Sequence, residues 1–200
     1  MKVLNNEAQL TVAACQGSVE AFEALIRYYE PRIKRMLYSL SRDYSLTQDL
    51  CQETFLAAYR ALPRMKGEEL HFAPWLYRIA LNQLRSEWRR RKRVTWIPFS
   101  PPQGSEEDAF DESGEDYLVC PERFEEQVGQ RDLIQRVLAR LPKASAVCLV
   151  LDTQGFSYRE IAEALQASQS SVRSRLSRAR QTFRQFYTIL GYQTGSDRTV

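Results

Sequence analysis

An acidic stretch that contains several prolines divides this chain in two and limits its fold more than any other sequence feature. Residues 96–126 carry ten Asp and Glu against a single Arg, whereas residues 1–95 and 127–200 each carry a net charge of +6. The residues that interrupt helices there are Pro98, Pro101, Pro102, Gly104 and Pro121. Apolar periodicity also stops within the stretch, so the sequence predicts two separately folded blocks joined by a linker.

We expect four segments along the 200 residues: a domain over 1–95, an acidic linker over 96–122, a second domain over 123–190 and a frayed tail over 191–200. Hydrophobic residues make up 44% of the chain, which is ordinary for a globular protein and argues against wholesale disorder. No apolar run approaches the roughly 20 residues of a membrane span, and the N-terminus lacks the apolar core of a signal peptide. The sequence therefore predicts a cytoplasmic protein with no membrane insertion.

Apolar residues of the first block recur at steps of three and four, which is the period of a helix face. This spacing predicts a helix over Ser18–Ser41, a second near Leu46–Leu62 and a third near Phe72–Arg93, with a short helix around Ala8–Cys15 before them. No convincing alternating strand pattern appears anywhere in the chain. The predicted fold class is therefore all-α, with two small helical domains.

The second block contains the sharper signal. Ser157 and Glu160 have the spacing of a capping box, a short turn follows at 166–168, and Ser168 is placed to cap the next helix. Two short helices with a tight turn and matched apolar faces predict a helix-turn-helix. The second of them carries many arginines, and arginine is the commonest reader of guanine. A purely structural helical hairpin is the alternative.

The chain offers little for catalysis or metal binding. His71 is the single histidine, so a catalytic triad or a histidine metal site would depend on one ring. The four cysteines form no C-x-x-C pair and are expected to be free, mostly buried thiols: Cys15, Cys51, Cys120 and Cys148. We therefore expect no enzyme activity, no metal and no cofactor.

Two helices of the first block carry patterned polar residues. The polar residues Asp49, Gln52, Glu53 and Arg60 share one face of the second helix, away from its apolar side. The third helix has an arginine and asparagine stripe that ends in five consecutive cations, 89–93, among aromatic residues. Cations bind phosphates and aromatic rings stack on unpaired bases, although we expect Trp75 to lie mainly in the core. The alternative is that both faces are ordinary solvated surfaces.

Three motifs in this order resemble the extracytoplasmic-function group of bacterial sigma factors. The stretch from Asp49 to Leu62 is similar to the family's core-polymerase-binding helix, and Pro74 to Asn82 is similar to its promoter-melting helix. Phe156–Ala162 together with Val172–Arg180 is similar to the family's region-four helix-turn-helix. The resemblance covers nearly the whole chain except the linker.

The resemblance implies roles for particular residues. Those expected to bind the clamp of the polymerase's largest subunit are Asp49, Gln52, Glu53 and Phe55. Those expected to bind the melted minus-ten element are Met65, Lys66, Arg78, Asn82, Arg85 and Arg89. Those expected to bind duplex DNA at minus thirty-five are Tyr158, Arg159, Ser170, Ser171, Arg173, Ser174, Arg175 and Arg178. Met65 replaces an aromatic residue common in the family and Ser177 replaces a bulky one, and both departures bear on which promoter sequence is read.

The resemblance also implies the partners. These are bacterial RNA polymerase core, through its clamp and the flap of the second-largest subunit, and promoter DNA as a duplex and as a melted strand. An anti-sigma factor is a further candidate partner, although no residue identifies one. A helix-turn-helix regulator that does not recruit polymerase is the alternative function. The acidic stretch is interpreted either as an extended segment within a basic channel of the polymerase or as a flexible tether.

Overall fold

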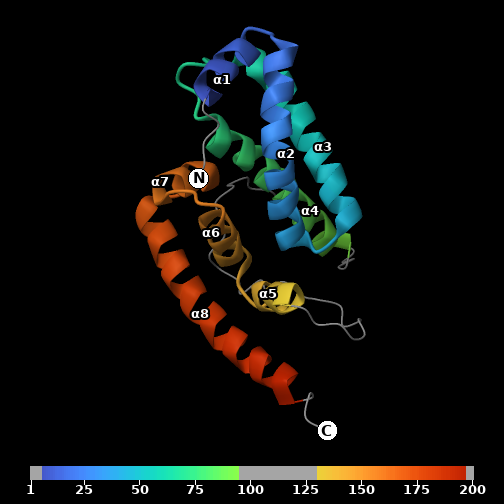
Figure 1. Ribbon diagram of the computed structural model, residues 1–200, viewed down its shortest axis with the longest axis vertical. Coiled ribbons are helices and arrows are strands. Elements are labelled where there is room, and N and C mark those ends of the chain that lie inside the picture. The colour runs from blue at the N-terminus through green and yellow to red at the C-terminus, as the bar shows by residue number, and fades with distance from the viewer. Residues whose placement is uncertain (1–5, 95–129, 197–200) are drawn as a thin grey trace, which may run out of the picture.

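The computed structural model describes residues 6–94 and 130–196, and every regular element in these ranges is a helix. Figure 1 shows two groups of helices that lie against each other, α1–α4 from the first block and α5–α8 from the second. The all-α, two-part fold predicted from the sequence is therefore confirmed. The predicted linker, 96–122, lies outside the described residues.

The N-terminal group contains four α-helices and one 3-10 turn, close to the predicted positions. Their bounds are α1 Glu7–Cys15, α2 Val19–Ser41, α3 Tyr44–Ala61, η1 Leu62–Arg64 and α4 Phe72–Val94. Side-chain caps fix two of the starts. The hydroxyl of Ser18 accepts from the Ala21 amide at 3.1 Å, and Asp43 Oδ1 accepts from the Leu46 amide at 2.9 Å. Because Asp43 is the cap, α3 begins two residues before the predicted Leu46.

The apolar stripe of α2 forms the centre of this group. Leu25, Tyr29 and Ile33 are fully buried on it, at steps of four that follow one helix face. Trp75 of α4 is only 6% exposed, so its predicted place in the core is confirmed. The indole of Trp75 is therefore not available for stacking on a base.

The C-terminal group contains α5 Gln130–Leu138, α6 Lys143–Thr153, α7 Tyr158–Leu165 and α8 Gln169–Ser196. The capping box at Ser157 is present, since its hydroxyl accepts from the Glu160 amide and Glu160 accepts from the Ser157 amide. In the turn between α7 and α8, Ser168 Oγ accepts from the Ser171 amide at 3.1 Å. The predicted helix-turn-helix and both of its caps are confirmed.

The long α8 corrects one expectation. Residues 191–200 were expected to be a frayed tail, but α8 continues through residues 191–196. Ser/Thr and Gln are tolerated in helices, and Gly191 and Gly195 weaken a helix without ending it. Residues 197–200 lie outside the described part of the chain.

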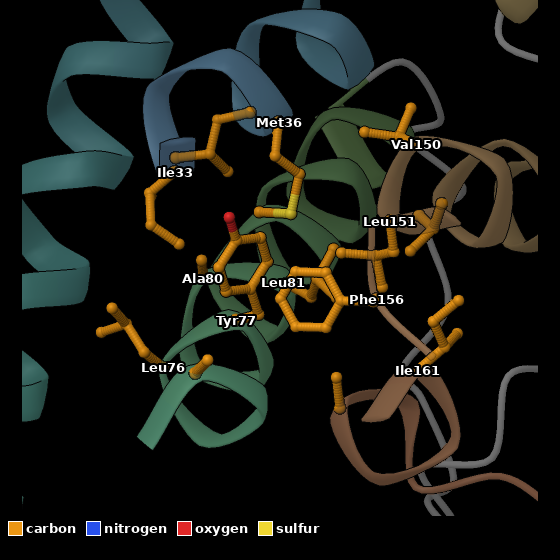
Figure 2. Close-up of a cluster of buried hydrophobic side chains, with 14 of the residues drawn as sticks. Ile33, Met36, Leu76, Tyr77, Ala80, Leu81, Val150, Leu151, Phe156 and Ile161 are labelled. Atoms are coloured by element: carbon orange, nitrogen blue, oxygen red, sulfur yellow. The ribbon is translucent and has the colours of Figure 1, made fainter. Parts of the chain in front are cut away.

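The two groups share one hydrophobic core. Figure 2 shows apolar side chains from α2 and α4 meeting those of α6, α7 and the segment between them. The residues labelled there are Ile33, Met36, Leu76, Tyr77, Ala80, Leu81, Val150, Leu151, Phe156 and Ile161. Tyr77 and Phe156 pack edge to face, with ring centroids 4.6 Å apart. This contact brings α7 directly against α4.

Candidate protein and nucleic-acid interfaces

The outer face of α3 presents an acidic and partly apolar surface. Asp49, Gln52 and Glu53 are exposed, as their helical spacing predicts. Leu56 and Tyr59 lie one turn further along the same face, and they are 45% and 51% exposed. Large apolar side chains ringed by polar ones are typical of a protein-binding surface. We call these five residues the α3 face.

Phe55 does not belong to the α3 face, contrary to the sequence interpretation. Its side chain is only 8% exposed and packs in the core beside Cys51 and Ala58. Residue 55 lies about 100° around the helix from residue 56, on the buried side. Extending the i, i+3, i+4, i+7 series from Asp49 gives 52, 53 and 56, so the periodicity contained the signal for Leu56.

The loop between α3 and α4 rests on α1. Met65 is half-buried against the core, whereas Lys66 is exposed and lies 3.9 Å from Glu69. A Cβ added to Gly67 would lie 2.8 Å from Val12 Cα, which is backbone of α1. The loop therefore approaches α1 as closely as a glycine allows. Of the two predicted loop residues, Lys66 is the one that faces solvent.

The predicted stripe of α4 forms one side of the helix. Asn82 and Arg89 are exposed, and Arg78 and Arg85 are half-buried. Arg85 Nη1 donates to Asn82 Oδ1 at 3.1 Å. This contact orients the Asn82 amide. We call Arg78, Asn82, Arg85 and Arg89 the α4 stripe.

Part of the cation run after the α4 stripe is engaged within the protein. Glu87 is only 9% exposed and accepts two hydrogen bonds from Arg90, at 2.6 and 2.8 Å, and one from Arg91 at 2.7 Å. Arg91 also donates to Asp43, the cap of α3, at 3.1 Å. Hydrogen bonds from Arg90 and then Arg91 lower the pKa of Glu87 to about 2. These contacts tie the end of α4 to the start of α3.

The outer face of α8 presents small and basic side chains. Ser170, Arg173, Ser174 and Arg178 are exposed, and Ser171 is half-buried. The opposite side buries Val172, Leu176 and Ala179, which hold α8 against α6 and α7. A helix with short polar residues between arginines can approach a major groove closely. We call Ser170, Arg173, Ser174 and Arg178 the α8 face.

Arg175 is absent from the α8 face, although it was among the predicted DNA-binding residues. Its side chain is only 8% exposed, because residue 175 follows the buried Val172 by three and precedes the buried Ala179 by four. The sequence interpretation placed Arg175 on the DNA-binding surface without testing its position on the helix. Arg175 therefore lies on the inner side of the helix, where it cannot reach a base.

The two predicted DNA-binding residues of α7 differ in their exposure to solvent. Arg159 is exposed, whereas Tyr158 is half-buried and packs against the core. The Tyr158 hydroxyl accepts from Arg180 at 3.4 Å, and Arg180 also binds both carboxylate oxygens of Asp152 at 2.8 and 2.9 Å. The sequence did not predict this ion pair between α6 and α8. The ion pair fixes the orientation of α8, the helix that carries the α8 face.

The described residues contain no group of acidic, histidine or cysteine side chains that could hold a metal. Cys15, Cys51 and Cys148 are free thiols, and burial raises the pKa of Cys51 and Cys148 to about 11. Cys120 lies outside the described ranges. Among the helices of the described segments, none is both long and apolar enough to cross a membrane.

Comparison with known proteins gives two family matches, one in each half of the chain. Residues 25–94 match the family described as Sigma-70 region 2, and residues 131–183 match Sigma-70, region 4. The first match includes the α3 face and the α4 stripe, and the second includes the α8 face. A helix-turn-helix regulator would not need the region 2 match, so the comparisons do not support that alternative.

Named relatives cover most of the chain. The RNA polymerase sigma-H factor of Pseudomonas aeruginosa is 31% identical over 90% of this chain and 93% of its own length. The ECF RNA polymerase sigma-E factor of Haemophilus influenzae is 30% identical, over 83% of this chain and 87% of its own. The Escherichia coli protein of the same name is 31% identical, over 83% and 86%.

Two solved structures share the fold. CnrH in complex with the cytosolic domain of CnrY has a TM-score of 0.67 at 22% identity and covers 92% of this chain and 99% of its own. The sigma factor RpoE of Bartonella quintana, in complex with the anti-sigma factor NepR, has a TM-score of 0.62 at 19% identity, over 86% and 99%. Sequence identity, two family matches and fold agree, and this chain belongs to the extracytoplasmic-function sigma factors of bacterial RNA polymerase.

Proposed function

We propose that this chain divides sigma-factor activity among three surfaces: the α3 face binds polymerase, the α4 stripe binds the melted strand and the α8 face reads duplex DNA. The observation that supports this division most directly is that the three surfaces lie on the outer sides of three different helices. Each is backed by a separate buried stripe, so each can be changed without removing core side chains. Polymerase carries out nucleotide transfer, and this chain directs it to promoters.

The α3 face fits the clamp of the polymerase's largest subunit. Leu56 and Tyr59 provide apolar area at its centre, and Asp49, Gln52 and Glu53 provide a polar, acidic rim. Buried apolar anchors supply most of the affinity at such interfaces, while charges set orientation and association rate. An acidic rim of this kind is complementary to a basic edge on the partner surface. Region 4 would in turn contact the flap of the second-largest subunit.

The α4 stripe fits a single strand. Arg78 and Arg89 are placed for phosphates, and Asn82 is placed to hydrogen-bond a base extruded from the stack. Lys66 adds a cation on the neighbouring loop. Extruding a base costs a few kcal/mol of stacking, which a prepared pocket offsets. The orienting contact from Arg85 prepares the Asn82 amide in this way.

The α8 face fits the major groove at minus thirty-five. Arg173 and Arg178 are placed to read guanine, Ser170 and Ser174 allow close approach, and Arg159 of α7 contacts the backbone. A bidentate arginine–guanine contact contributes about 1–3 kcal/mol of discrimination. Loss of a phosphate contact would instead lower the affinity for DNA evenly across sequences.

An anti-sigma factor is a reasonable regulatory partner, since both solved relatives above are complexes and the second contains a named anti-sigma factor. A groove of about 480 Å³ between the two helix groups could receive part of such a protein. Its walls on α5, α6 and α8 are mainly apolar but include Thr153 and Gln154, and Arg32 and Arg35 of α2 line the other side. The site of action is the cytoplasm, where polymerase and promoter DNA are found.

Core binding is the test of the α3 face. The double variant Asp49→Lys with Glu53→Lys should abolish binding in a titration with core polymerase, because both carboxylates face solvent and would become repulsive at a basic clamp. Helicity should not change. The matched control is Arg173→Ala with Arg178→Ala, which should retain core affinity. If both double variants bound core polymerase with equal affinity, the α3 face would be excluded as the polymerase-binding surface.

The acidic linker has two possible roles, an occupant of a basic polymerase channel or a passive tether. The test replaces Glu106, Glu107, Asp108, Asp111 and Glu112 with Gln or Asn at constant length. A channel role predicts altered yields of abortive transcripts relative to full-length ones, because charge complementarity would be lost. Unchanged yields would favour the tether.

A further inference from the structure

One arginine in a row that borders the α8 face is bound within the protein. The row follows α8 at steps of four, three and four, and its members are Arg173, Ser177, Arg180 and Arg184. Arg180 is half-buried, at the edge where the outer and inner sides of α8 meet, and the other three residues are exposed. It lies about 10 Å along the helix axis from Arg173. When α8 lies in a major groove, an arginine in this row is within reach of the DNA backbone.

The guanidinium of Arg180 is held by the end of α6, which lies beside α8 (Figure 1). Its Nη2 atom donates to both carboxylate oxygens of Asp152, at 2.8 and 2.9 Å, and its Nη1 atom donates to the Tyr158 hydroxyl at 3.4 Å. The side chain of Arg180 is 41% exposed and that of Asp152 is 22% exposed. Because the guanidinium is partly open to solvent, a DNA phosphate can compete with Asp152 for it.

The charge of Asp152 decides this competition. A carboxylate and a phosphate offer an arginine the same kind of contact, a charge-assisted hydrogen bond. While Asp152 is present, Arg180 loses its hydrogen bonds to the carboxylate before it gains a phosphate, and the carboxylate repels an approaching phosphate. Partly exposed ion pairs add little to the stability of a fold. The larger consequence of this pair therefore concerns what α8 binds.

We propose that Asp152 is a positioning residue that raises the sequence specificity of the α8 face, because it withholds Arg180 from DNA phosphates and fixes the orientation of α8. This inference rests on the proposed role of the α8 face. Phosphate contacts add affinity for every sequence, whereas base contacts add affinity for one. With Arg180 released, α8 would bind any duplex more tightly, and Arg173 and Arg178 would meet their bases in a less fixed orientation. Asp152 itself touches no base and acts through Arg180.

The salt dependence of duplex binding measures whether Arg180 reaches a phosphate. Each phosphate contact adds about 0.9 to the slope of log affinity against log salt concentration. Holoenzyme reconstituted from core polymerase and the full chain is titrated, over a range of salt concentrations, with two duplexes of equal length. One duplex carries a promoter that the holoenzyme transcribes, and in the other the minus-thirty-five element is scrambled. The ratio of the two affinities measures specificity.

Asp152→Asn keeps the shape of the side chain and removes its charge, so the released Arg180 should steepen the salt slope on the scrambled duplex by about 0.9. The specificity ratio should fall, because the orientation of α8 on the promoter is no longer fixed. Arg180→Gln should leave the slope on the scrambled duplex unchanged, since Arg180 contacts no phosphate while Asp152 holds it. The double variant Asp152→Asn with Arg180→Gln should return to the wild-type slope.

Glu163→Gln is the matched control for the loss of one negative charge. Its carboxylate lies on α7 and has His71, rather than an arginine, as its partner, so the salt slope should not change. Circular dichroism follows the helicity and thermal unfolding of each variant, so that a folding defect is recognised.

Three results would overturn the proposal: a wild-type slope in Asp152→Asn, an equal steepening in Glu163→Gln, or a steeper slope that persists in the double variant. An equal loss of affinity for both duplexes at an unchanged slope would also overturn it, because the ion pair would then only support the fold. Failure of the proposed function gives a different result. Wild-type holoenzyme that binds both duplexes equally would contradict minus-thirty-five reading by the α8 face, while the slopes on the scrambled duplex would still test the withholding of Arg180.

Discussion

The two basic helices of the molecule, α4 and α8, differ in how their arginines are held. On α4, Arg90 and Arg91 are bound by the nearly buried Glu87, and Arg85 is bound to Asn82. On α8, the outward Arg173 and Arg178 lie among small serines in solvent, and the helix is fixed from its inner side by the Arg180–Asp152 pair. On α4, the polar side chains themselves are oriented before DNA binds. On α8, the position of the helix is fixed, but its outward side chains are not.

This difference matches two kinds of DNA. A melted strand is flexible, so a surface that binds it gains when its own groups are already oriented. Duplex DNA is itself a stiff, regular partner, and long arginine side chains on a rigid helix can adjust to its groove. We therefore expect α4 to act on opened DNA and α8 to act on the closed duplex.

The largest effect should come from separating these two steps. Arg178→Ala should weaken closed-complex formation on duplex promoters by about 5- to 150-fold, the loss of one arginine–guanine contact. Asn82→Ala should leave that step unchanged and impair opening, because the extruded base loses its partner. Footprinting on duplex and pre-melted promoters measures both steps.

Pre-melted DNA provides the control for this comparison. It should leave the binding defect of Arg178→Ala largely in place, because the minus-thirty-five duplex is unchanged. It should rescue Asn82→Ala only in part, because the base pocket remains damaged. If both variants fail at the same step, the assignment of α4 to opened DNA and α8 to duplex DNA is wrong.

A smaller effect should come from the loop that precedes α4. Gly67→Ala would place a methyl group 2.8 Å from Val12 Cα, and the loop must move off α1 because backbone cannot yield cheaply. Overpacking of this kind costs about 1–3 kcal/mol, so thermal unfolding should shift to lower temperature. Opening should slow more than duplex binding, which depends on α8. Glu68→Ala, at an exposed position of the same loop, is the matched control.

Most of this architecture could be predicted from the sequence, because helix caps and apolar spacing are local signals. The Ser18 and Ser157 caps mark where α2 and α7 begin, and steps of three and four mark their buried sides. The three surfaces could be placed on their helices for the same reason. Phe55 and Arg175 were assigned to binding surfaces from the family resemblance, although helical spacing places both on the buried sides of their helices.

The contacts between distant segments could not be predicted in this way. Nothing local to Tyr77 indicates that its hydroxyl meets Gln154, or that His71 meets Glu163. The Asp152–Arg180 ion pair joins residues 28 positions apart, and a single sequence does not show such pairs. These contacts depend on how whole helices pack, which the local spacing of residues does not reveal.

The burial of Arg175 allows a test of which side of α8 contributes to stability and which side reads DNA. Arg175→Ala should lower the stability of the folded chain by about 1–3 kcal/mol, because its stem packs in the core and its charged head lies on the inner side. Arg173→Ala, two residues earlier and exposed, should leave stability within about 0.5 kcal/mol. Chemical denaturation measures both. Discrimination between promoter bases should change in Arg173→Ala, and a change only in Arg175→Ala would reverse the two assignments.

The smallest effect concerns the charge that holds the α4 arginines. Hydrogen bonds from Arg90 and Arg91 hold the pKa of Glu87 at about 2, below the ordinary 4.5 of a glutamate. Because the folded pKa is the lower one, the stabilisation is fully present above about pH 4.5 and is lost as the pH falls through 2. Glu87→Gln keeps an acceptor for the arginines but cannot titrate. Its unfolding free energy should therefore depend less on pH between 4.5 and 2 than that of the wild type. A pH dependence in Glu87→Gln equal to that of the wild type would contradict this role of Glu87.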